Sequence, residues 1–448
     1  DNLSQFGTIS TSTSTNHLDF GFPALCLMFD QAGQDMVSEN HGYNWLSNQL
    51  MLQDRVKTSS YNNFIWKLHF QHIKSANDIL KTLVSDEEPQ GQIANYIGQA
   101  LASRAFDYLQ LVQAYQFTYL GHEEELAVPI VTETMSEEEA MNNPLATVKD
   151  VYTQIMSDLD TAIPYLENNP VDGDKAQINA AVAYGLRARA NMLMGEYANA
   201  ATDAGKALEL SGATPYSIEE VSVPSFNNVA NSWIWGSIIT TNNDVVQTGI
   251  INWTSWVSNQ TTFGYTGAST ALYVCIDKNM YERISDTDWR KKQWVAPAGS
   301  ALEGQSNYMS EADRQLIPAY GSLKFRPTEG DAEDYLIGAS SSVPLMRVEE
   351  MYFIEAEAAE HVAAGTGIAL LTDFMKQYRD PAYAFAGGDA IDEIVFQKRV
   401  ELWGEGHTFF DIKRLNMSVT RGYEGTNWQD AQSMLNTNGR PAWTNYVI

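Results

Sequence analysis

The region from residue 343 to residue 414 constrains the fold of this chain more than any other, because it combines helix-periodic apolar residues with many charges. Its first half predicts a helix with an apolar face. The residues of that face lie three to four positions apart and are Leu345, Val348, Tyr352, Ala356 and Ala359. Further apolar residues lie on its flanks, so we expect this helix to be buried on more than one side. Charges on a buried helix lose their hydration and need partners.

The second half of the same region supplies those partners. Residues 391–403 predict another helix, which Gly404 and Gly406 end. The segment FFDIKR follows at residues 409–414 with two rings and two charges of opposite sign. We therefore predict a central helical hairpin that ion pairs hold together. The charged residues expected in these pairs are Arg347, Glu349, Glu355, Glu357, Arg399, Glu401, Asp411 and Arg414.

The spaced order of these residues resembles the C-terminal signature of the SusD/RagB family. The resemblance rests on two segments, PLMRVEEMYFIEAEA and QKRVELWGEGHTFFDIKRLN. Members of this family are surface lipoproteins of Bacteroidota that capture glycans for an outer-membrane importer. The N-terminal half is similar to the family too, through W-x3-F-x2-I-x2-AN at residues 66–77 and G-x-A-x3-RA-x2-Y-x2-L at residues 98–111.

A third segment, MYERISDTDWRKKQW at residues 280–294, resembles a further family motif. Asp288 and Arg290 stand in the matching places. Trp289 departs from the family, because proline is usual at that position.

Helical hairpins are also predicted before residue 215. Residues 63–115 predict two antiparallel helices, the first capped by Asn63, and residues 147–167 predict a third helix with Asp150 in its first turn. A single tetratricopeptide-like repeat follows, in which small residues let two helices approach closely. Its residues are Tyr184, Ala188, Gly195, Tyr197, Ala200, Ala204 and Ala207.

The predicted fold class is mainly α: a tetratricopeptide-like helical-hairpin scaffold with an irregular, loop-rich lobe that contains short strands. This is the SusD-like α-α superhelix that the resemblance implies. We expect residues 1–16 to be a flexible lead-in and residues 17–215 to form the N-terminal helical region. Residues 216–342 are expected to form a variable region that presents the ligand. Residues 343–448 are expected to pack on the N-terminal helices.

The composition disfavours several functions. A formal charge of −28 repels nucleic acid and anionic lipid, so a neutral ligand is favoured. No phosphate-binding glycine loop and no G-x-S-x-G motif occurs. Acidic residues are too numerous for a glycosidase pair to stand out. Cys26 and Cys275 form no disulfide framework, and we expect both to be buried and free.

Two histidines carry a possible metal-binding pattern. His69 and His72 lie three positions apart on a predicted helix, as two metal ligands can. The pattern lacks the glutamate of a zincin motif, and no third ligand is evident. The default interpretation is a pair on a helix surface, with a metal site as the alternative. We therefore predict neither a metal nor a cofactor.

Two segments offer the side chains that a sugar ring requires. The apolar face of a sugar stacks on an aromatic ring, and its hydroxyls need hydrogen-bonding groups in the plane of the sugar. We predict ligand contacts there, against the alternative that these rings pack in the core. The candidates are Tyr43, Asn44, Trp45, Tyr61, Asn62, Trp253, Trp256, Asn259 and Tyr265.

The resemblance implies a function without catalysis. Such a protein captures an oligosaccharide or polysaccharide at the cell surface for a SusC-like, TonB-dependent transporter. A lipid anchor, expected to precede residue 1, would attach it to the outer membrane. Two alternatives remain open at this point. One is uptake of peptides, as in the RagB branch, and the other is a glycoside hydrolase.

Overall fold

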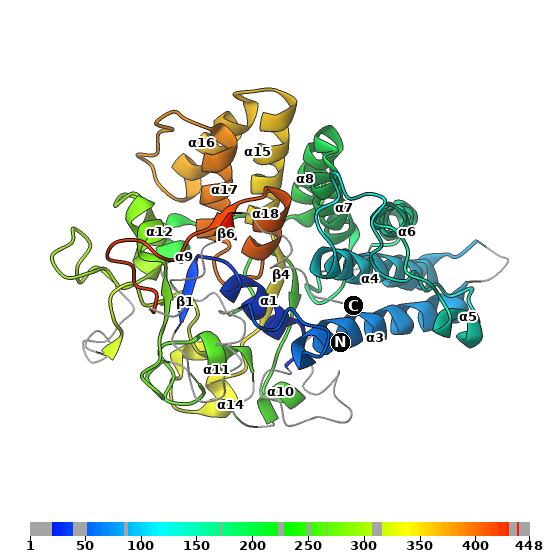
Figure 1. The fold of residues 1–448 in the computed structure, drawn as a ribbon, viewed down its shortest axis with the longest axis horizontal. Helices are drawn as coiled ribbons and strands as arrows, with labels where there is room; N and C mark the ends of the chain where they lie inside the picture. Colours follow the sequence, from blue (N-terminus) through cyan, green and yellow to red (C-terminus); the bar gives the residue numbers. More distant parts are fainter. Residues whose placement is uncertain are drawn as a thin grey trace.

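The computed structural model describes residues 20–38, 52–84, 88–170, 173–222, 228–247, 249, 252–265, 267–306, 316–429 and 437–438 of the chain. Helices dominate these residues, and the strands are short (Figure 1). This arrangement confirms the predicted mainly α fold class. Among the described helices, none combines the length and the apolar character that a membrane span needs.

The scaffold is a row of long helices in which each helix packs on the next, so that α3 contacts α4, α4 contacts α6, α6 contacts α7, and α7 contacts α8. Helix α8 then packs on α15, which joins the N-terminal and C-terminal parts of the chain (Figure 1). The helices of the row are α3 (Ser60–Leu83), α4 (Gly91–Tyr115), α6 (Val148–Asn168), α7 (Ala180–Met194), α8 (Tyr197–Ser211) and α15 (Val348–Val362). Helix pairs stacked in this way form the predicted superhelical scaffold.

Local capping residues determine where several of these helices begin and end. Thr147 and Asp150 form a capping box at the start of α6, and Gly195 ends α7 in the left-handed conformation with φ of 76°. Both boundaries agree with the sequence. The predicted cap of the first long helix is wrong, however, because Ser59 rather than Asn63 accepts the backbone N–H of Tyr61.

The C-terminal helices are α15, α16 (Thr366–Tyr378), α17 (Ala390–Glu401) and α18 (Thr408–Arg414). Helix α15 begins at Val348, whereas the apolar spacing predicted a helix from Leu345. Residues Val343–Arg347 instead form strand β4, which pairs antiparallel with β2 (Trp233–Ser237). Pairing with a distant strand therefore overrides the local helical spacing there.

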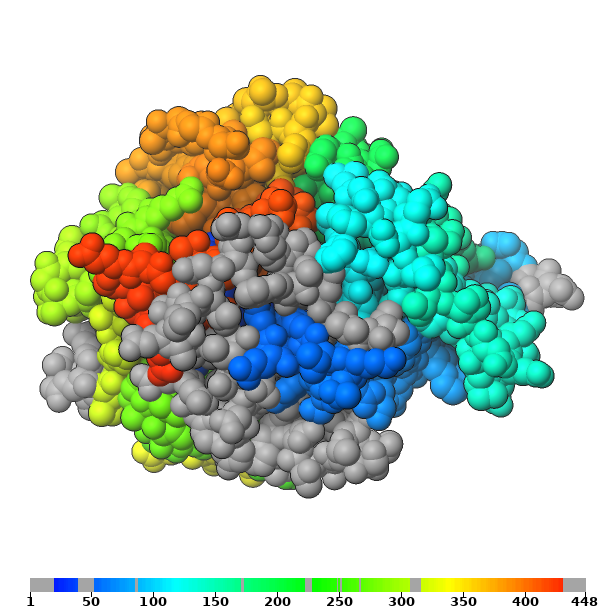
Figure 2. Space-filling model, in the orientation of Figure 1, coloured from blue at the N-terminus to red at the C-terminus, as the bar shows by residue number. Residues whose placement is uncertain are grey.

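The remaining elements are short and lie mostly between the two helical groups in sequence. Strand β1 (Met36–Ser38) pairs antiparallel with β3 (Val274–Ile276), and β5 (Ser418–Val419) pairs with β6 (Thr437–Asn438). The others are α5 (Glu137–Met141), α9 (Ile218–Ser222), α10 (Asp244–Gln247), α11 (Trp253–Val257), α12 (Lys278–Arg283), η1 (Trp289–Gln293), η2 (Thr328–Gly330) and α14 (Tyr335–Gly338). In the space-filling view, the N-terminal helices (blue to teal) lie on the right and the C-terminal residues (orange to red) on the left (Figure 2).

Helix α1 (Phe22–Gln31) is buried along its whole length and packs on α18. Cys26 is buried in it, and Cys275 lies half-buried in β3. Neither cysteine forms a disulfide, as expected, but the expectation that both are buried is wrong for Cys275, because that position of the short strand retains contact with solvent.

Asp30 at the end of α1 is a buried carboxyl with a raised pKa. Burial raises the pKa of Asp30 to about 8, although the backbone N–H of Gly406 donates to its Oδ2 atom at 2.8 Å. Its Oδ1 atom has no hydrogen-bond partner among the described residues. The side chain is therefore protonated in the folded protein at neutral pH and ionised in the unfolded chain.

We expect Asp30→Asn to stabilise the protein increasingly as the pH rises from about 4 to about 8. In this window wild-type folding takes up a proton, so wild-type stability falls with pH, and asparagine removes that dependence. Because the pKa rises from 3.8 to about 8, the expected gain at pH 8 is on the order of 5 kcal/mol. Denaturant unfolding of both proteins at pH 5 and pH 8 measures it. An equal difference at the two pH values would contradict a protonated Asp30.

Candidate functional site

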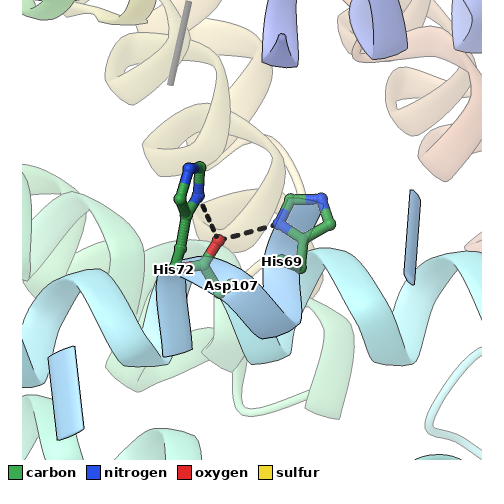
Figure 3. A group of neighbouring side chains, drawn as sticks. All are labelled: His69, His72 and Asp107. Atoms are coloured by element: carbon green, nitrogen blue, oxygen red, sulfur yellow. Dashed lines mark hydrogen bonds and ion pairs between the residues drawn. The ribbon is translucent and has the colours of Figure 1, made fainter. Parts of the chain in front are cut away.

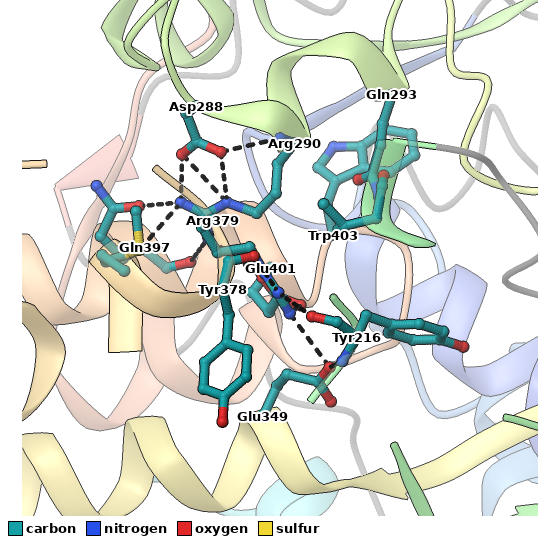
Figure 4. Close-up of polar contacts among 12 residues, drawn as sticks. Tyr216, Asp288, Arg290, Gln293, Glu349, Tyr378, Arg379, Gln397, Glu401 and Trp403 are labelled. Carbon is teal, nitrogen blue, oxygen red and sulfur yellow. Dashed lines mark hydrogen bonds and ion pairs between the residues drawn. The ribbon is translucent and has the colours of Figure 1, made fainter. Parts of the chain in front are cut away.

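Buried charges form a network at the centre of the molecule. Glu401, at the end of α17, accepts hydrogen bonds from Arg379 at 2.7 and 2.8 Å (Figure 4). Arg290 and Arg347 also donate to Glu401, each at 3.3 Å. Burial by itself would raise the pKa of Glu401, but the three guanidinium groups outweigh burial and hold that pKa well below its usual range. Glu401 is therefore ionised at neutral pH and joins three arginines.

Equal numbers of cationic and acidic side chains make up this central ion-pair network among the described residues. Glu405 accepts from Arg347 at 2.8 and 2.9 Å and from Lys324 at 2.8 Å. Because each charge has opposite neighbours, the cost of burying it is offset. The members are Arg290, Lys324, Arg347, Arg379, Asp288, Glu349, Glu401 and Glu405.

Most of the other predicted ion pairs also form. Arg414 donates to Glu357 at 2.6 and 2.7 Å and to Asp411 at 2.8 Å, and these contacts connect α18 to α15. Arg399 pairs with Asp35 near the start of the chain. The hairpin held by ion pairs is therefore confirmed. Glu355 is the exception, because it is half-buried and forms no ion pair with any described residue.

The central network also holds residues 280–294, the segment in which Trp289 replaces the usual proline of the family motif. The Asp288 side chain caps η1 by accepting the backbone N–H of Arg290 at 2.9 Å, and it pairs with the Arg290 guanidinium at 2.6 Å (Figure 4). The backbone N–H of Trp289 donates to the Arg379 carbonyl at 3.0 Å. Trp289 therefore lies between the buried residues Asp288 and Arg290. Their contacts with α17 and with the end of α16 set its position.

The Trp289 side chain lines an open surface hollow of about 330 Å³. Trp289 is half-buried, and the ammonium group of Lys292 lies 4.1 Å from the centre of its ring. The hollow is bounded by η1, by the turn that follows α16, and by residues near 302–305. Its lining residues are Asp286, Thr287, Trp289, Lys292, Leu302, Gln305, Asp380, Pro381 and Ala382.

The chemistry of the Trp289 hollow suits a small neutral ligand with an apolar face and several hydroxyls. Trp289 offers an aromatic surface, and Thr287, Lys292 and Gln305 offer hydrogen-bonding groups beside it. The volume lies within the range of small-molecule sites. A ligand ring would displace the flexible Lys292 from the indole at a cost of about 0.5–1 kcal/mol.

The first group of predicted ligand residues lies largely beyond what the structure describes. Tyr43, Asn44 and Trp45 are outside the described residues. Tyr61 and Asn62 lie in the first turn of α3, where only 8% and 5% of their surfaces are exposed. The Asn62 amide donates to the Val56 carbonyl at 3.4 Å. These two side chains therefore support the start of the helix.

The second group lies inside the loop-rich lobe. Trp256 stacks on Tyr265 with ring centres 4.4 Å apart, and Asn259 donates to the carbonyls of Val274 and Ser322 at 2.8 and 2.9 Å. The expectation that these rings lie exposed on loops is wrong, because the exposed fraction is at most 3% at Trp253, Trp256, Asn259 and Tyr265. Burial of large rings stabilises the lobe, which has little regular structure of its own. Ligand contact by these residues stays a prediction.

Trp289 was not among the ligand residues predicted from the sequence, and the predicted surface position of the two histidines is wrong. A tryptophan in the usual place of proline was the available signal for Trp289, whose half-buried side chain packs against the core on one side. His69 and His72 were expected on a helix surface. They are buried instead, with exposed fractions of 0% and 8%, because this face of α3 packs against α4.

Comparison with known families identifies the chain. One family model, described as starch-binding and associating with the outer membrane, matches residues 26–192, and the SusD family model matches residues 275–446. The chain belongs to the SusD family. No curated protein sequence matches this SusD-family chain significantly.

Solved structures share the fold of this SusD-family protein. A SusD-like carbohydrate-binding protein from Bacteroides vulgatus matches with a TM-score of 0.77 and 22% identity, covering 100% of this chain and 92% of the other. A SusD superfamily protein from Bacteroides thetaiotaomicron matches with a TM-score of 0.73 and 19% identity, covering 94% and 90%. A laminarin-binding SusD-like protein matches with a TM-score of 0.65 and 19% identity, covering 88% and 87%.

Proposed function

We propose that this SusD-family protein binds an oligosaccharide or polysaccharide and that the Trp289 hollow forms part of the binding site. The observation that carries the proposal is a half-buried indole at a surface hollow beside hydrogen-bonding side chains, with its backbone hydrogen-bonded to Arg379. Laminarin binding by one structural neighbour supports a glycan as the ligand class. The net charge of −28 also favours a neutral ligand over an anionic one.

The proposed role is capture without catalysis. A glycosidase needs two carboxyl groups facing each other across the bond, about 5–10 Å apart. The carboxylates of the hollow already have partners, since Asp380 accepts from the Thr287 hydroxyl at 2.9 Å and Asp286 pairs with Lys291 at 2.7 Å. These contacts favour binding over hydrolysis. By analogy with the family, the protein would be a lipoprotein at the cell surface and would pass its ligand to a SusC-like, TonB-dependent transporter in the outer membrane.

Replacing Trp289 with alanine is expected to weaken glycan binding about tenfold or more, because the stacking surface is lost. Isothermal titration with the polysaccharides that retard the wild-type protein in affinity gels, laminarin and starch among them, measures the change. Tyr96→Ala is the matched control. It removes an exposed ring on α4 and is expected to leave affinity unchanged.

Other outcomes of this experiment would contradict parts of the proposal. If Trp289→Ala bound the glycan as tightly as wild type while Trp45→Ala bound it more weakly, the binding site would lie at residues 43–45. If the wild-type protein released reducing ends and replacement of one carboxylate abolished the release, the protein would be a glycoside hydrolase. Retention of peptides but of no polysaccharide would indicate peptide uptake.

A further inference from the structure

Two histidines and one aspartate meet in the interior between α3 and α4, far from the Trp289 hollow in sequence. His69 and His72 point from α3 toward Asp107 on α4 (Figure 3). The Nδ1 atoms of the two rings lie 2.8 and 3.3 Å from the same carboxylate oxygen, Oδ1 of Asp107. The exposed fractions of these residues are 0%, 8% and 0%. We call this group the His-His-Asp cluster.

The side chains of the cluster do not satisfy one another. Oδ2 of Asp107 and the Nε2 atoms of both histidines are buried and have no hydrogen-bond partner among the described residues. No described lysine or arginine pairs with Asp107, whose ion-pair partners among the described residues are the two imidazoles. A buried carboxylate without a full positive charge beside it is costly. The cluster therefore lacks a cation.

Histidine binds a metal through a ring nitrogen that carries no proton, so a bound ion would replace the hydrogen between each Nδ1 atom and Asp107. The two Nδ1 atoms and Oδ1 of Asp107 face one another between the two helices (Figure 3).

The geometry points to a binding site for one divalent transition-metal ion, and we propose zinc as its occupant. The three ligand atoms lie within 4.8 Å of one another. Two ligands about 2.1 Å from a tetrahedral ion are separated by roughly 3.4 Å. The contacts of 2.8 and 3.3 Å to Asp107 and the spread of up to 4.8 Å among the ligand atoms differ from this value, so the two imidazoles would rotate to hold one ion. Two imidazoles and one carboxylate suit zinc, whereas calcium and magnesium require oxygen ligands.

Gln110 is a candidate for a fourth ligand. Gln110 lies one turn along α4 from Asp107, and its Oε1 atom is buried without a described partner. Gln110 and Phe22 line a cavity of about 70 Å³, and the Phe22 ring packs edge-on against the ring of His69. A water needs about 30 Å³, so this neighbouring cavity, which the three cluster side chains do not line, has room for one. Three protein ligands from two helices would then join the first helical hairpin of the scaffold.

Metal-free wild-type protein without an affinity tag tests this proposal directly. Zinc titrated at pH 7.5 is expected to bind with one ion per chain and to raise the melting temperature. Cobalt(II) in its place is expected to give the intense visible absorption of a four-coordinate site.

Variants locate the ion. His72→Gln is expected to weaken zinc binding roughly a hundredfold or more, beyond the 10–100-fold effects typical of outer-shell residues. His122→Gln is the matched control, because that half-buried histidine contacts a backbone carbonyl and the Phe117 ring and lies outside the cluster, and the variant should bind zinc as wild type does. Circular dichroism checks that each variant is folded. Absence of stoichiometric zinc binding and of the cobalt spectrum in folded wild-type protein would overturn the proposal, as would an unchanged affinity in folded His72→Gln.

Discussion

Glu401→Gln is expected to lower the free energy of unfolding by roughly 3–5 kcal/mol. Glutamine keeps the shape of the side chain but removes the negative charge that Arg290, Arg347 and Arg379 share. The three guanidinium groups remain buried, and their repulsion is no longer offset at the centre of the network. Denaturant unfolding followed by circular dichroism measures the loss.

An exposed ion pair provides the control for this prediction. Glu209 pairs with Lys206 at 2.7 Å on α8, and its side chain is 64% exposed. Glu209→Gln is expected to change the free energy of unfolding by less than about 1 kcal/mol, because solvent screens the pair. Similar losses in the two variants would show that burial does not strengthen the central network. Glycan titration of Glu401→Gln also tests whether the network positions Trp289 through Arg290.

Gly406→Ala is expected to destabilise the protein by roughly 2–4 kcal/mol. Gly406 has a φ of +86°, which costs an alanine about 1–2 kcal/mol. An added Cβ would also lie 2.7 Å from the Cα atom of Cys26 in the buried helix α1. Because that atom belongs to the backbone, α1 would have to shift, and overpacking of this kind costs about 1–3 kcal/mol.

Gly387 separates these two contributions. Its φ of +91° is nearly the same, but an added Cβ would meet no atom within 4 Å. Gly387→Ala is therefore expected to show the backbone cost alone. Melting temperatures and denaturant midpoints of both variants measure the difference. Equal stability of the two variants would show that the close approach of Gly406 to α1 contributes nothing to the loss of stability in Gly406→Ala.

Much of the scaffold was predictable because its signals act over a few residues. Thr147 and Asp150 cap α6 through contacts within one turn, and Gly195 ends α7 because it tolerates a positive φ. The ion pairs of Arg347, Glu401 and Arg414 were also predictable, because charges that occur on apolar helices cannot remain unpaired.

The candidate site was less predictable, since its residues come together from separate parts of the chain. Arg379 and Arg290 join Glu401 from the end of α16 and from η1, and no local pattern relates them. Trp256 and Trp289 are both aromatic residues beside polar ones in the sequence. One is fully buried and the other lines a hollow, and packing of the lobe makes that difference.

The sequence alone determines which segments of this chain become helices, because apolar periodicity and capping act between residues close in the chain. It also determines which charges need a partner, because a charge on a buried helix is costly wherever the partner lies. Long-range packing settles the rest. His69 contacts Asp107, which lies 38 positions further along the chain. Leu345 lies in strand β4, which pairs with the distant strand β2, although its apolar spacing predicted a helix. Such contacts depend on the relative placement of whole helices and strands, and pattern along the chain carries no record of that placement.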